Sequence, residues 1–518
     1  MIRRVALFLF LFASLSTTAQ HRESVTVEVV DVPVYVVSGK EPVRNLTRDD
    51  FELFVNGKRT AIEYFDTVGD AASPGGAGAR PVLRERRLFV LLFDLAFTRS
   101  YLSRRAQLAA IQLIDKAEPL DAFAIATFEA AAGLRYTLPF THDRVALKTA
   151  LQQLTARETY DPLSLVPTTT PTTRAELLPN EPVDPDEDEP VPAWTEAHDH
   201  SVTSEPSVEA MITPRGTEQA MRSSTGSAML GCFVGLAALA TNLSRIEGQK
   251  HVVMISEGFD ISAMNDYRAM VKGAVGLYTA LQLDEVFRAY QAAGVFLHTL
   301  DPAGLRGVKE SVGAGSLGIL ASGTGGQAMN DRNDLQLALT ELKNAYSYGY
   351  VLGFRPVDAR KGENKIVVKV KRERVSVTHR RGFVPGSAGP MNGLYLADVV
   401  MNDVPQTGLN PVMEIEHGHV RARLPMKQIA AQLGEEDDAE LLVYLFDGKG
   451  RPVDFRRRAI AVTGNEVEVL DLQLGLPPGT YALKTLLRVG DSLGFTRANL
   501  KVGAPRAQTP YRTNGAQK

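Results

Sequence analysis

Two acidic residues stand directly after apolar runs that predict buried strands. Asp94 ends the run Val90–Phe93 and is followed by the hydroxyl of Thr98, and Glu257 comes shortly after the run His251–Ile255. Carboxylate and hydroxyl oxygens are the ligands that Mg²⁺ and Ca²⁺ take in proteins. The same groups can also satisfy one another by hydrogen bonds. The pattern therefore indicates either a divalent-cation site or a hydrogen-bonded cluster without metal.

Strands and helices alternate from residue 87 to residue 385, and this alternation must position the two acids. Apolar strands are predicted at "RLFVLLFD", "AFAIATFE", "HVVMISEG" and "VFLHTLD", with helical patterns between them. Such alternation is typical of an α/β fold, a mainly parallel sheet with helices on both faces. The carboxyl ends of parallel strands share one sheet edge, so Asp94 and Glu257 are expected to meet there.

Strand-like patterns flank this region on both sides. Residues 24–68 read as a small β element with a hairpin at an Asn-Gly turn, and residues 69–86 as a Gly/Ala/Pro linker. Residues 390–505 carry strand patterns at the spacing of a β-sandwich, and residues 506–518 are expected to be a disordered tail. Within the α/β region, residues 155–222 are rich in Pro and Thr and then acidic, which predicts a flexible insertion.

Composition and the N-terminus narrow the class of protein. The chain has 518 residues, enough for two or three domains, and its 57 basic and 60 acidic residues give a net charge of −3. Without a basic excess, no nucleic-acid partner is expected. Residues 1–20 have the pattern of a signal peptide, and no other stretch approaches transmembrane length. The mature chain is therefore expected to be secreted or periplasmic, with no membrane span.

A series of motifs resembles the secreted von Willebrand factor A (VWA)-related proteins of acidobacteria. They occur in order over about residues 25–385 as "NLTRDDFELFVNGKRTAIEYF", "RLFVLLFD", "GQKHVVMISEGFD", "AGVFLHTLDPAGL", "LASGTGGQAMNDRNDLQLALTEL", "YSYGYVLGF" and "VSVTHRRGFV". The resemblance implies a Rossmann-like VWA domain. Domains of this family are usually adhesion or protein-binding modules and not enzymes.

VWA domains often carry a metal-ion-dependent adhesion site, and the resemblance implies where its parts would lie. The D-x-S-x-S strand end corresponds to Asp94, Ala96 and Thr98, the later hydroxyl to Ser227, and the last acid to Glu257. Ala96 has replaced a hydroxyl, and Glu257 stands where the family has Asp. Mn²⁺ or Ca²⁺ tolerates such departures better than Mg²⁺, because their coordination geometry is looser. The metal ligands predicted in this way are Asp94, Thr98, Ser227 and Glu257.

Two further readings of this face stay open. The four residues can form a metal-free hydrogen-bonded cluster. The acidic insertion, with Trp194, enters the chain just before Ser227 and can cap the face or remain a solvated linker.

The function expected from these observations is non-catalytic binding of a protein or surface polymer. No G-x-S-x-G, H-E-x-x-H or Walker sequence supports hydrolase or nucleotide chemistry. The run Gly313–Gly318 matches G-x-G-x-x-G but does not directly follow a strand, so no cofactor is expected beyond one possible divalent cation, Mg²⁺, Mn²⁺ or Ca²⁺. The alternatives are a metal-free structural subunit of a cell-envelope assembly and a metal-assisted hydrolase using Asp94 and Glu257.

Overall fold

The computed structural model describes most of the chain outside its ends and one long internal stretch. The described residues are 29–69, 86–154, 214–260, 275–306, 313–356, 359–360, 362–385, 389–406, 408–416, 419–432, 439–460, 468–473 and 476–502. The predicted signal peptide, residues 70–85 of the linker, the tail and the insertion up to residue 213, Trp194 included, lie outside them. Residues 214–222 were expected in the insertion but form the first turns of α5 (Pro214–Leu243). Pro214 suits a helix start, where the missing N–H costs no hydrogen bond.

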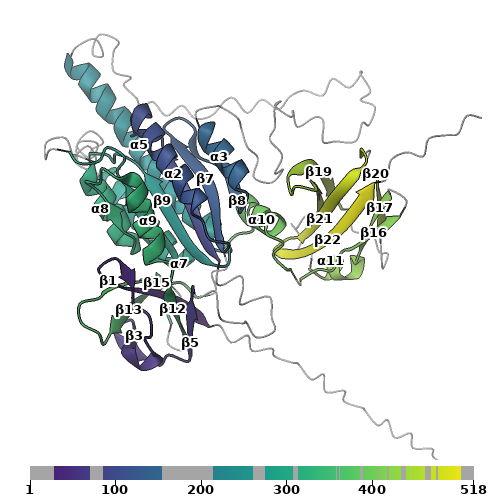
Figure 1. Ribbon diagram of the computed structural model, residues 1–518, viewed down its shortest axis with the longest axis horizontal. Coiled ribbons are helices and arrows are strands. Elements are labelled where there is room, and N and C mark those ends of the chain that lie inside the picture. The colour runs from purple at the N-terminus through teal and green to yellow at the C-terminus, as the bar shows by residue number, and fades with distance from the viewer. Residues whose placement is uncertain are drawn as a thin grey trace, which may run out of the picture.

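A sheet with helices packed around it forms the centre of the α/β domain (Figure 1). It has six strands, in the order β11-β10-β9-β6-β7-β8. Neighbouring strands are parallel from β11 to β7, and β8 is antiparallel to β7. The strands are β6 (Arg87–Asp94), β7 (Asp121–Glu129), β8 (Gly133–Thr141), β9 (Gln249–Ile255), β10 (Val295–Leu300) and β11 (Ala328–Met329). The expected α/β class is therefore present.

Helices cover both faces of this sheet, which explains why its inner strands β6, β9 and β10 are buried along their whole length. Alternate residues of β6 point to opposite faces. Leu88, Val90 and Leu92 join a core cluster with α5, α7 and α8, whereas Phe89 and Leu91 join a second cluster with α2, α3 and α9. The helices are α2 (Ser100–Asp115), α3 (Arg144–Gln152), α7 (Val275–Ala293), α8 (Ala314–Thr324) and α9 (Leu335–Ala345).

A second, small β domain is built from two distant parts of the chain. One sheet has the order β14-β1-β12-β5, with β2 on β1, and the other has the order β15-β13-β3-β4. The first part supplies β1 (Val30–Ser38), β2 (Glu41–Pro42), the 3-10 turn η1 (Arg48–Asp50), β3 (Phe51–Val55), β4 (Lys58–Thr60) and β5 (Tyr64–Val68). The second part supplies β12 (Gly349–Phe354), β13 (Asn364–Val370), β14 (Ser376–His379) and β15 (Gly382–Phe383).

This arrangement corrects the expected assignment of residues 349–385 to the α/β domain. β12 lies between β1 and β5, and β13 pairs with β3, so the α/β domain is inserted between β5 and β12. Alternating strands and helices led to the wrong assignment, because a strand's pattern shows which face is buried and not which strand it pairs with. The hairpin of β3 and β4 is confirmed, and Asn56 and Gly57 turn it with φ of 51° and 81°.

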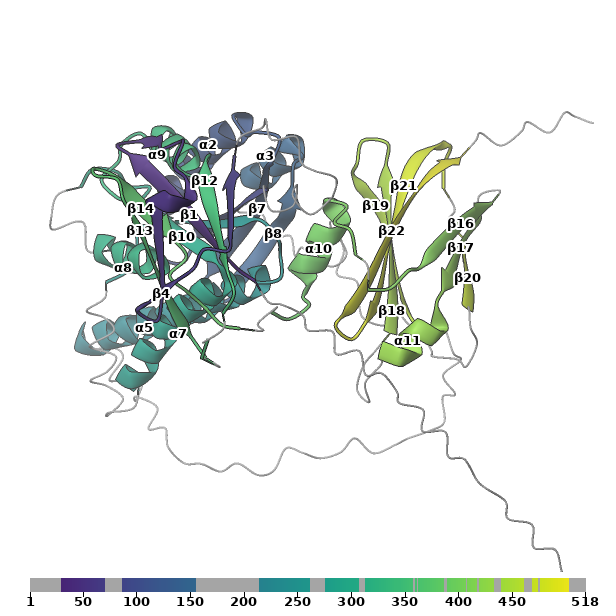
Figure 2. The same cartoon turned by 90° about the horizontal axis from the view of Figure 1, so that it is seen from below.

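The C-terminal part contains two antiparallel sheets (Figure 2). One has the order β16-β17-β20, the other β19-β18-β21-β22, and one apolar cluster draws residues from both. The elements are β16 (Val412–Glu416), β17 (His419–Leu424), α11 (Met426–Gln432), β18 (Ala439–Asp447), β19 (Pro452–Ala459), β20 (Glu468–Gln473), β21 (Gly479–Val489) and β22 (Ser492–Val502).

Helix α10 (Gly393–Met401) lies between the α/β domain and the C-terminal sheets (Figure 2). On one side, Asp398 forms a buried two-pronged ion pair with Arg86, with N–O distances of 3.1 and 2.9 Å. On the other side, Leu396 and Val399 pack in a cluster with residues of β18 and β21. Lys484 of β21 donates to the carbonyl of Val400 over 2.7 Å. The helix therefore joins both parts through buried contacts.

One helix among the described residues is long and apolar enough to cross a membrane. It is the stretch Thr225–Leu243 of α5, with a mean hydropathy of 1.5 over its most apolar window. The expectation that no stretch after the signal peptide reaches such a length is thus wrong. Met229, Phe233 and Leu236 of this stretch are buried in the core of the α/β domain, against β6 and α7.

Candidate functional site

The loops that follow β6, β9 and β10 come together at one edge of the central sheet, and we call this edge the strand-end face. Asp94 is the last residue of β6, Glu257 follows β9, and Asp301 follows β10. These strands are parallel neighbours, so their carboxyl ends meet, as the sequence predicts for Asp94 and Glu257. Asp94 and Asp301 are each 1% exposed and Glu257 is 8% exposed. Three carboxyl groups are therefore buried at this edge.

Both carboxylate oxygens of Asp94 already have partners inside the protein. Oδ1 accepts the backbone N–H groups of Ala96 and Phe97, each over 3.0 Å, and Oδ2 accepts the hydroxyl of Ser256 over 2.5 Å. Burial raises the pKa of Asp94 and these hydrogen bonds lower it, but the effect of burial is larger, so the pKa is about 6. Asp94 therefore ties the β6 loop to the residue that follows β9.

Glu257 is held by two arginines. Oε2 accepts the backbone N–H of Arg99 over 2.9 Å. The guanidinium group of Arg99 also contacts both oxygens: its Nε lies 3.0 Å from Oε2, and its Nη2 lies 2.5 Å from Oε1. Nη1 of Arg306 lies 3.2 Å from Oε1. Burial raises the pKa of Glu257, but hydrogen bonds from Arg99 and the charges of both arginines outweigh it and hold the pKa below its ordinary value. Glu257 is thus an ionised carboxylate whose charge is balanced by two arginines.

Thr98 and Ser227 differ in their relation to this network. The hydroxyl of Thr98 accepts the backbone N–H of Glu257 over 3.3 Å, so Thr98 belongs to it. Ser227 lies on α5 with its side chain exposed, and among the described residues no hydrogen bond joins it to Asp94 or Glu257. The structure therefore brings Asp94, Thr98 and Glu257 together and leaves Ser227 apart.

The donor set on this face does not fit the metal ion that the VWA resemblance implies. Such an ion needs free oxygen ligands, but the oxygens of Asp94 are hydrogen-bonded and those of Glu257 face guanidinium groups. Ala96 supplies no hydroxyl. Among the described residues no group of three or more His, Cys, Asp or Glu side chains is arranged to hold a metal. We therefore assign no metal-dependent step to this face.

Three residues of the network, Arg99, Ser256 and Arg306, are not predicted from the sequence. Asp301 is expected there only as the one further acid at a strand end, which a metal-assisted hydrolase would need. Two of the three are adjacent to a predicted residue: Arg99 follows Thr98, and Ser256 precedes Glu257. A search for cations near strand-end acids would have found Arg99. Arg306 gives no local signal, because it reaches Glu257 only through the folded loop after β10.

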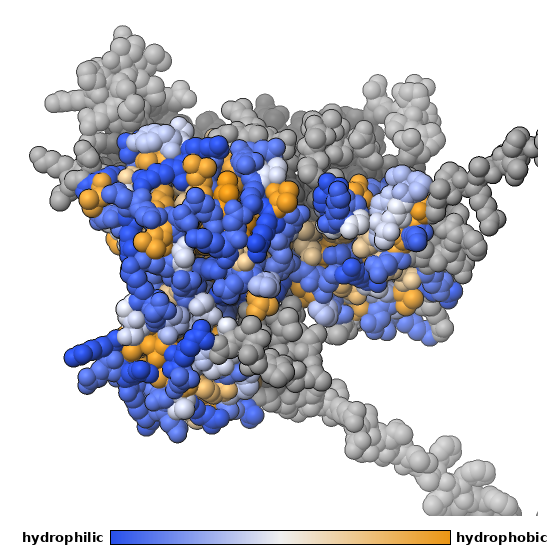
Figure 3. Space-filling view, viewed as in Figure 1, coloured by the Kyte–Doolittle hydropathy of each residue, from blue (hydrophilic) through white to orange (hydrophobic). Residues whose placement is uncertain are grey.

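The outward side of the strand-end face carries exposed aromatic, aliphatic and cationic side chains. Tyr101, in the first turn of α2, is 61% exposed, and Leu305, beside Arg306, is 69% exposed. The Arg99 side chain is 57% exposed, and its guanidinium carbon lies 5.3 Å from the centre of the Tyr101 ring. Elsewhere on the molecule, hydrophobic residues form separate groups among hydrophilic ones, as Figure 3 shows over α2 and α9.

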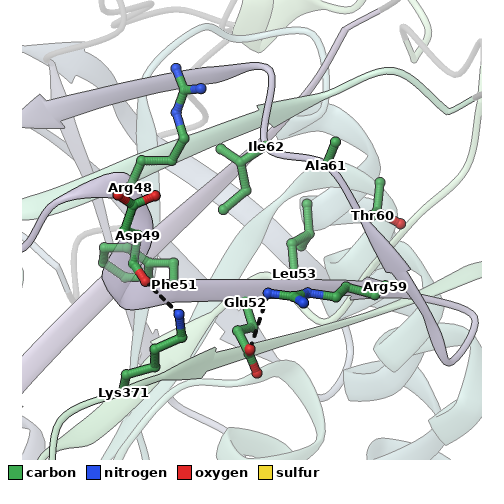
Figure 4. A pocket seen from close by; sticks show the side chains of 10 residues that line it. All are labelled: Arg48, Asp49, Phe51, Glu52, Leu53, Arg59, Thr60, Ala61, Ile62 and Lys371. Atoms are coloured by element: carbon green, nitrogen blue, oxygen red, sulfur yellow. Dashed lines mark hydrogen bonds and ion pairs between the residues drawn. The ribbon is translucent and has the colours of Figure 1, made fainter.

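Two hollows lined by described residues lie away from these carboxylates. One of about 420 Å³ is in the small β domain, where Lys371 donates to the carbonyl of Asp49 and Arg59 pairs with Glu52 (Figure 4). Another, of about 270 Å³, lies beside α9 and is lined in part by Lys40 and Glu341, which form an ion pair. Lys371, Arg59 and Lys40, three basic side chains that line these hollows, therefore already have partners within the protein.

The strand histidines form a neutral pair in the core. His298 Nδ1 accepts the backbone N–H of Gln327, so its Nε2 carries the proton and donates to His251 Nδ1 over 3.2 Å. Burial lowers the pKa of both, that of His298 to about 3. Tyr35 of the small β domain packs against His251 and donates to Gln249 at the start of β9. These residues join the two domains at the edge opposite Asp94.

Comparisons with known proteins give distant structural likenesses. No family model matches the sequence, and no curated protein matches it. BatB, a conserved hypothetical protein from Bacteroides thetaiotaomicron, aligns with a TM-score of 0.24 and 12% identity over 50% of this chain and 98% of its own. An aerotolerance-related membrane protein from Bacteroides fragilis, with multiple mutations to serines, aligns at 0.23 and 11% over 50% and 98%. A von Willebrand factor type A protein from Catenulispora acidiphila aligns at 0.24 and 9% over 93% and 75%. Such scores establish no family, so the α/β class rests on the sheet topology itself.

Proposed function

We propose that this protein is exported and acts as a non-catalytic interaction protein, binding a protein partner through the strand-end face. The observation that carries the proposal is the exposure of Tyr101, Leu305 and Arg99 around a network in which each buried carboxylate has partners. Aromatic residues and arginine are enriched among the residues that dominate binding energy at protein interfaces. Because Glu257 and Tyr101 hold the Arg99 side chain in place, it loses little conformational entropy when a partner binds.

The state of the carboxylates supports a binding role over hydrolysis. A general base needs a free lone pair within reach of a substrate, and a catalytic metal needs open coordination positions. Asp94 is buried with both oxygens bonded, and Glu257 is paired with two guanidinium groups. A metal-assisted hydrolase would have to break these contacts before any chemical step.

The order of VWA-like motifs and the N-terminal pattern support the rest of the proposal. The motifs "RLFVLLFD" and "GQKHVVMISEGFD" supply two of the strands whose ends form this face. The signal-peptide pattern of residues 1–20 supports export, so the partner is expected outside the cytoplasmic membrane. It can be a protein or a surface polymer, and the exposed aromatic and aliphatic groups favour a protein.

A second candidate function is a structural subunit of an envelope assembly. The buried pair of Arg86 and Asp398 favours it, because α10 then holds the C-terminal sheets at a fixed position beside the α/β domain. In that case the C-terminal part would be a spacer or a second binding module. The two candidates differ in whether the strand-end face contacts a partner.

Site-specific photo-crosslinking tests the proposal. A photoreactive amino acid is placed at position 101 or 305, and at the matched exposed apolar positions 145 and 453, which are 74% and 46% exposed on other elements. We expect one protein from envelope extracts to crosslink at 101 and 305 only. The double variant Tyr101→Ala/Leu305→Ala should bind that protein at least about tenfold more weakly, since truncating an interface anchor costs more than about 1 kcal/mol. Equal crosslinking at all four positions would contradict the proposal.

A further inference from the structure

The loop after β10 returns an arginine toward the acids of the strand-end face. Arg306 lies five positions after Asp301, and its side chain is only 11% exposed. Its Nη2 pairs with Oδ2 of Asp301, and its Nη1 lies 3.2 Å from Oε1 of Glu257. One guanidinium therefore bridges the acid that follows β10 and the acid that follows β9.

Burying two carboxylates side by side needs a positive charge between them. A buried charge is tolerated only when it is paired, and two close like charges repel each other strongly in a region of low dielectric. Asp301 has Arg306 as its only ion-pair partner among the described residues. Glu257 has Arg99 as a second partner. The Arg99 side chain is 57% exposed, however, whereas the Arg306 side chain is only 11% exposed. Arg306 is thus the buried cation of the network.

The backbone conformation of this loop positions Arg306 beside the acids. Gly304 has φ of +77°, and a Cβ there would lie 2.6 Å from Oδ1 of Asn333. That same oxygen accepts the N–H of Leu305 over 3.0 Å, and Oδ1 of Asp301 accepts the N–H of Ala303 over 2.9 Å. A side chain at position 304 would be strained by the positive φ and by this contact. Hydrogen bonds to Ala303 and Leu305 therefore fix the described part of the loop just before Arg306.

We propose that Arg306 is the resident cation of the strand-end face, bridging Asp301 and Glu257 in the role that a divalent metal ion would otherwise have. A guanidinium stays protonated at any physiological pH and cannot be removed by a chelator. Its planar fork matches two carboxylates. The face keeps its shape without metal, whether or not it binds a partner, so this inference does not depend on the proposed function.

Thermal unfolding of the full chain with and without divalent cations tests this role. Wild type should melt at the same Tm in EDTA and in millimolar Mg²⁺, Mn²⁺ or Ca²⁺. Arg306→Ala should lower the Tm by roughly 5–10 °C, because it leaves two buried carboxylates without their common partner. Added Mn²⁺ or Ca²⁺ should recover several degrees in this variant, since an ion that binds only the folded state raises its stability.

Arg105→Ala is the matched control. Arg105 also contacts this region, but within the part of the chain that the structure describes it donates to the carbonyls of Pro302 and Asn333 and to no carboxylate. Its loss should lower the Tm without creating any response to cations. The proposal is overturned if wild type itself gains Tm with a cation or loses it in EDTA. It is also overturned if Arg306→Ala responds to cations no more than Arg105→Ala does.

Discussion

At the scale of single residues, buried carboxyl groups of the strand-end face are stabilised in two different ways. Glu257 stays ionised because two guanidinium groups offset its desolvation, and its pKa is held below the ordinary value. Among the described residues Asp94 has only neutral donors, so burial dominates and raises its pKa to about 6. Two acids on one sheet edge therefore respond differently to pH.

The raised pKa of Asp94 predicts a specific pH dependence of stability. The folded-state value, about 6, lies above the unfolded value, so the folded chain binds this proton more tightly. The resulting stabilisation is fully present below about pH 4 and is lost as the pH rises through 6. The contribution of Asp94 to the free energy of unfolding therefore falls by about 3 kcal/mol over this range. Asp94→Asn cannot ionise and should lack this component. Urea unfolding of both proteins at pH 4.5 and 7.0 checks this, and equal changes with pH in both would refute it.

At the level of single elements, a buried ion pair is one of the contacts that hold α10 against the α/β domain. Arg86, which directly precedes β6, donates to both oxygens of Asp398 and also to the carbonyl of Glu247. Asn402, just after the helix, donates to Oδ1 of Asp398 as well and to the carbonyl of Phe140. The Asn392 side chain caps the first turn by accepting the N–H of Tyr395. The helix is therefore fixed against the α/β domain by polar contacts and against β18 and β21 by apolar ones.

Breaking this pair from one side should be costly. Asp398→Asn leaves Arg86 buried without its counter-charge, and we expect a loss of about 3–5 kcal/mol in the free energy of unfolding. Arg497→Gln is the matched control, because its pair with Asp403 is much more exposed and should contribute less than about 1 kcal/mol. Urea unfolding of the full chain measures both variants. A loss for Asp398→Asn no larger than that of the control would show that α10 does not depend on the pair.

At the scale of the whole molecule, the α/β domain is an insertion within the small β domain. β12 has β1 on one side and β5 on the other, and β13 pairs with β3. Only the short stretch Tyr346–Tyr348 separates α9 from β12. The N-terminal strands and the strands after α9 therefore depend on each other for folding.

This dependence predicts the effect of an N-terminal deletion. A chain that begins at residue 86 retains β12 and β13 but lacks β1, β3 and β5, so it exposes apolar strand edges and should aggregate. A chain that begins at residue 29 keeps every described strand and should be monomeric and melt cooperatively. Size-exclusion chromatography and circular dichroism compare the two. A monomeric, cooperatively melting chain from residue 86 would mean that β12 and β13 fold without the N-terminal strands.

Several local features of this protein are predictable from its amino-acid sequence alone. Buried apolar runs ending in Asp94 and Glu257 predicted strands whose acids share one sheet edge, and Asn56-Gly57 predicted a hairpin. These predictions hold because side-chain periodicity and turn geometry depend on residues close together in the chain.

Contacts between groups that are far apart in the chain are not predictable in this way. Glu257 is neutralised by Arg99, 158 positions before it, and by Arg306, 49 positions after it. Ser227 has the residue type of a ligand, but α5 places it on an exposed side of the helix. β12 pairs with strands about 300 positions away. Local patterns show which face of an element is buried, but the pairing of distant segments depends on how the whole chain packs. At the strand-end face, that packing places arginines against the acids.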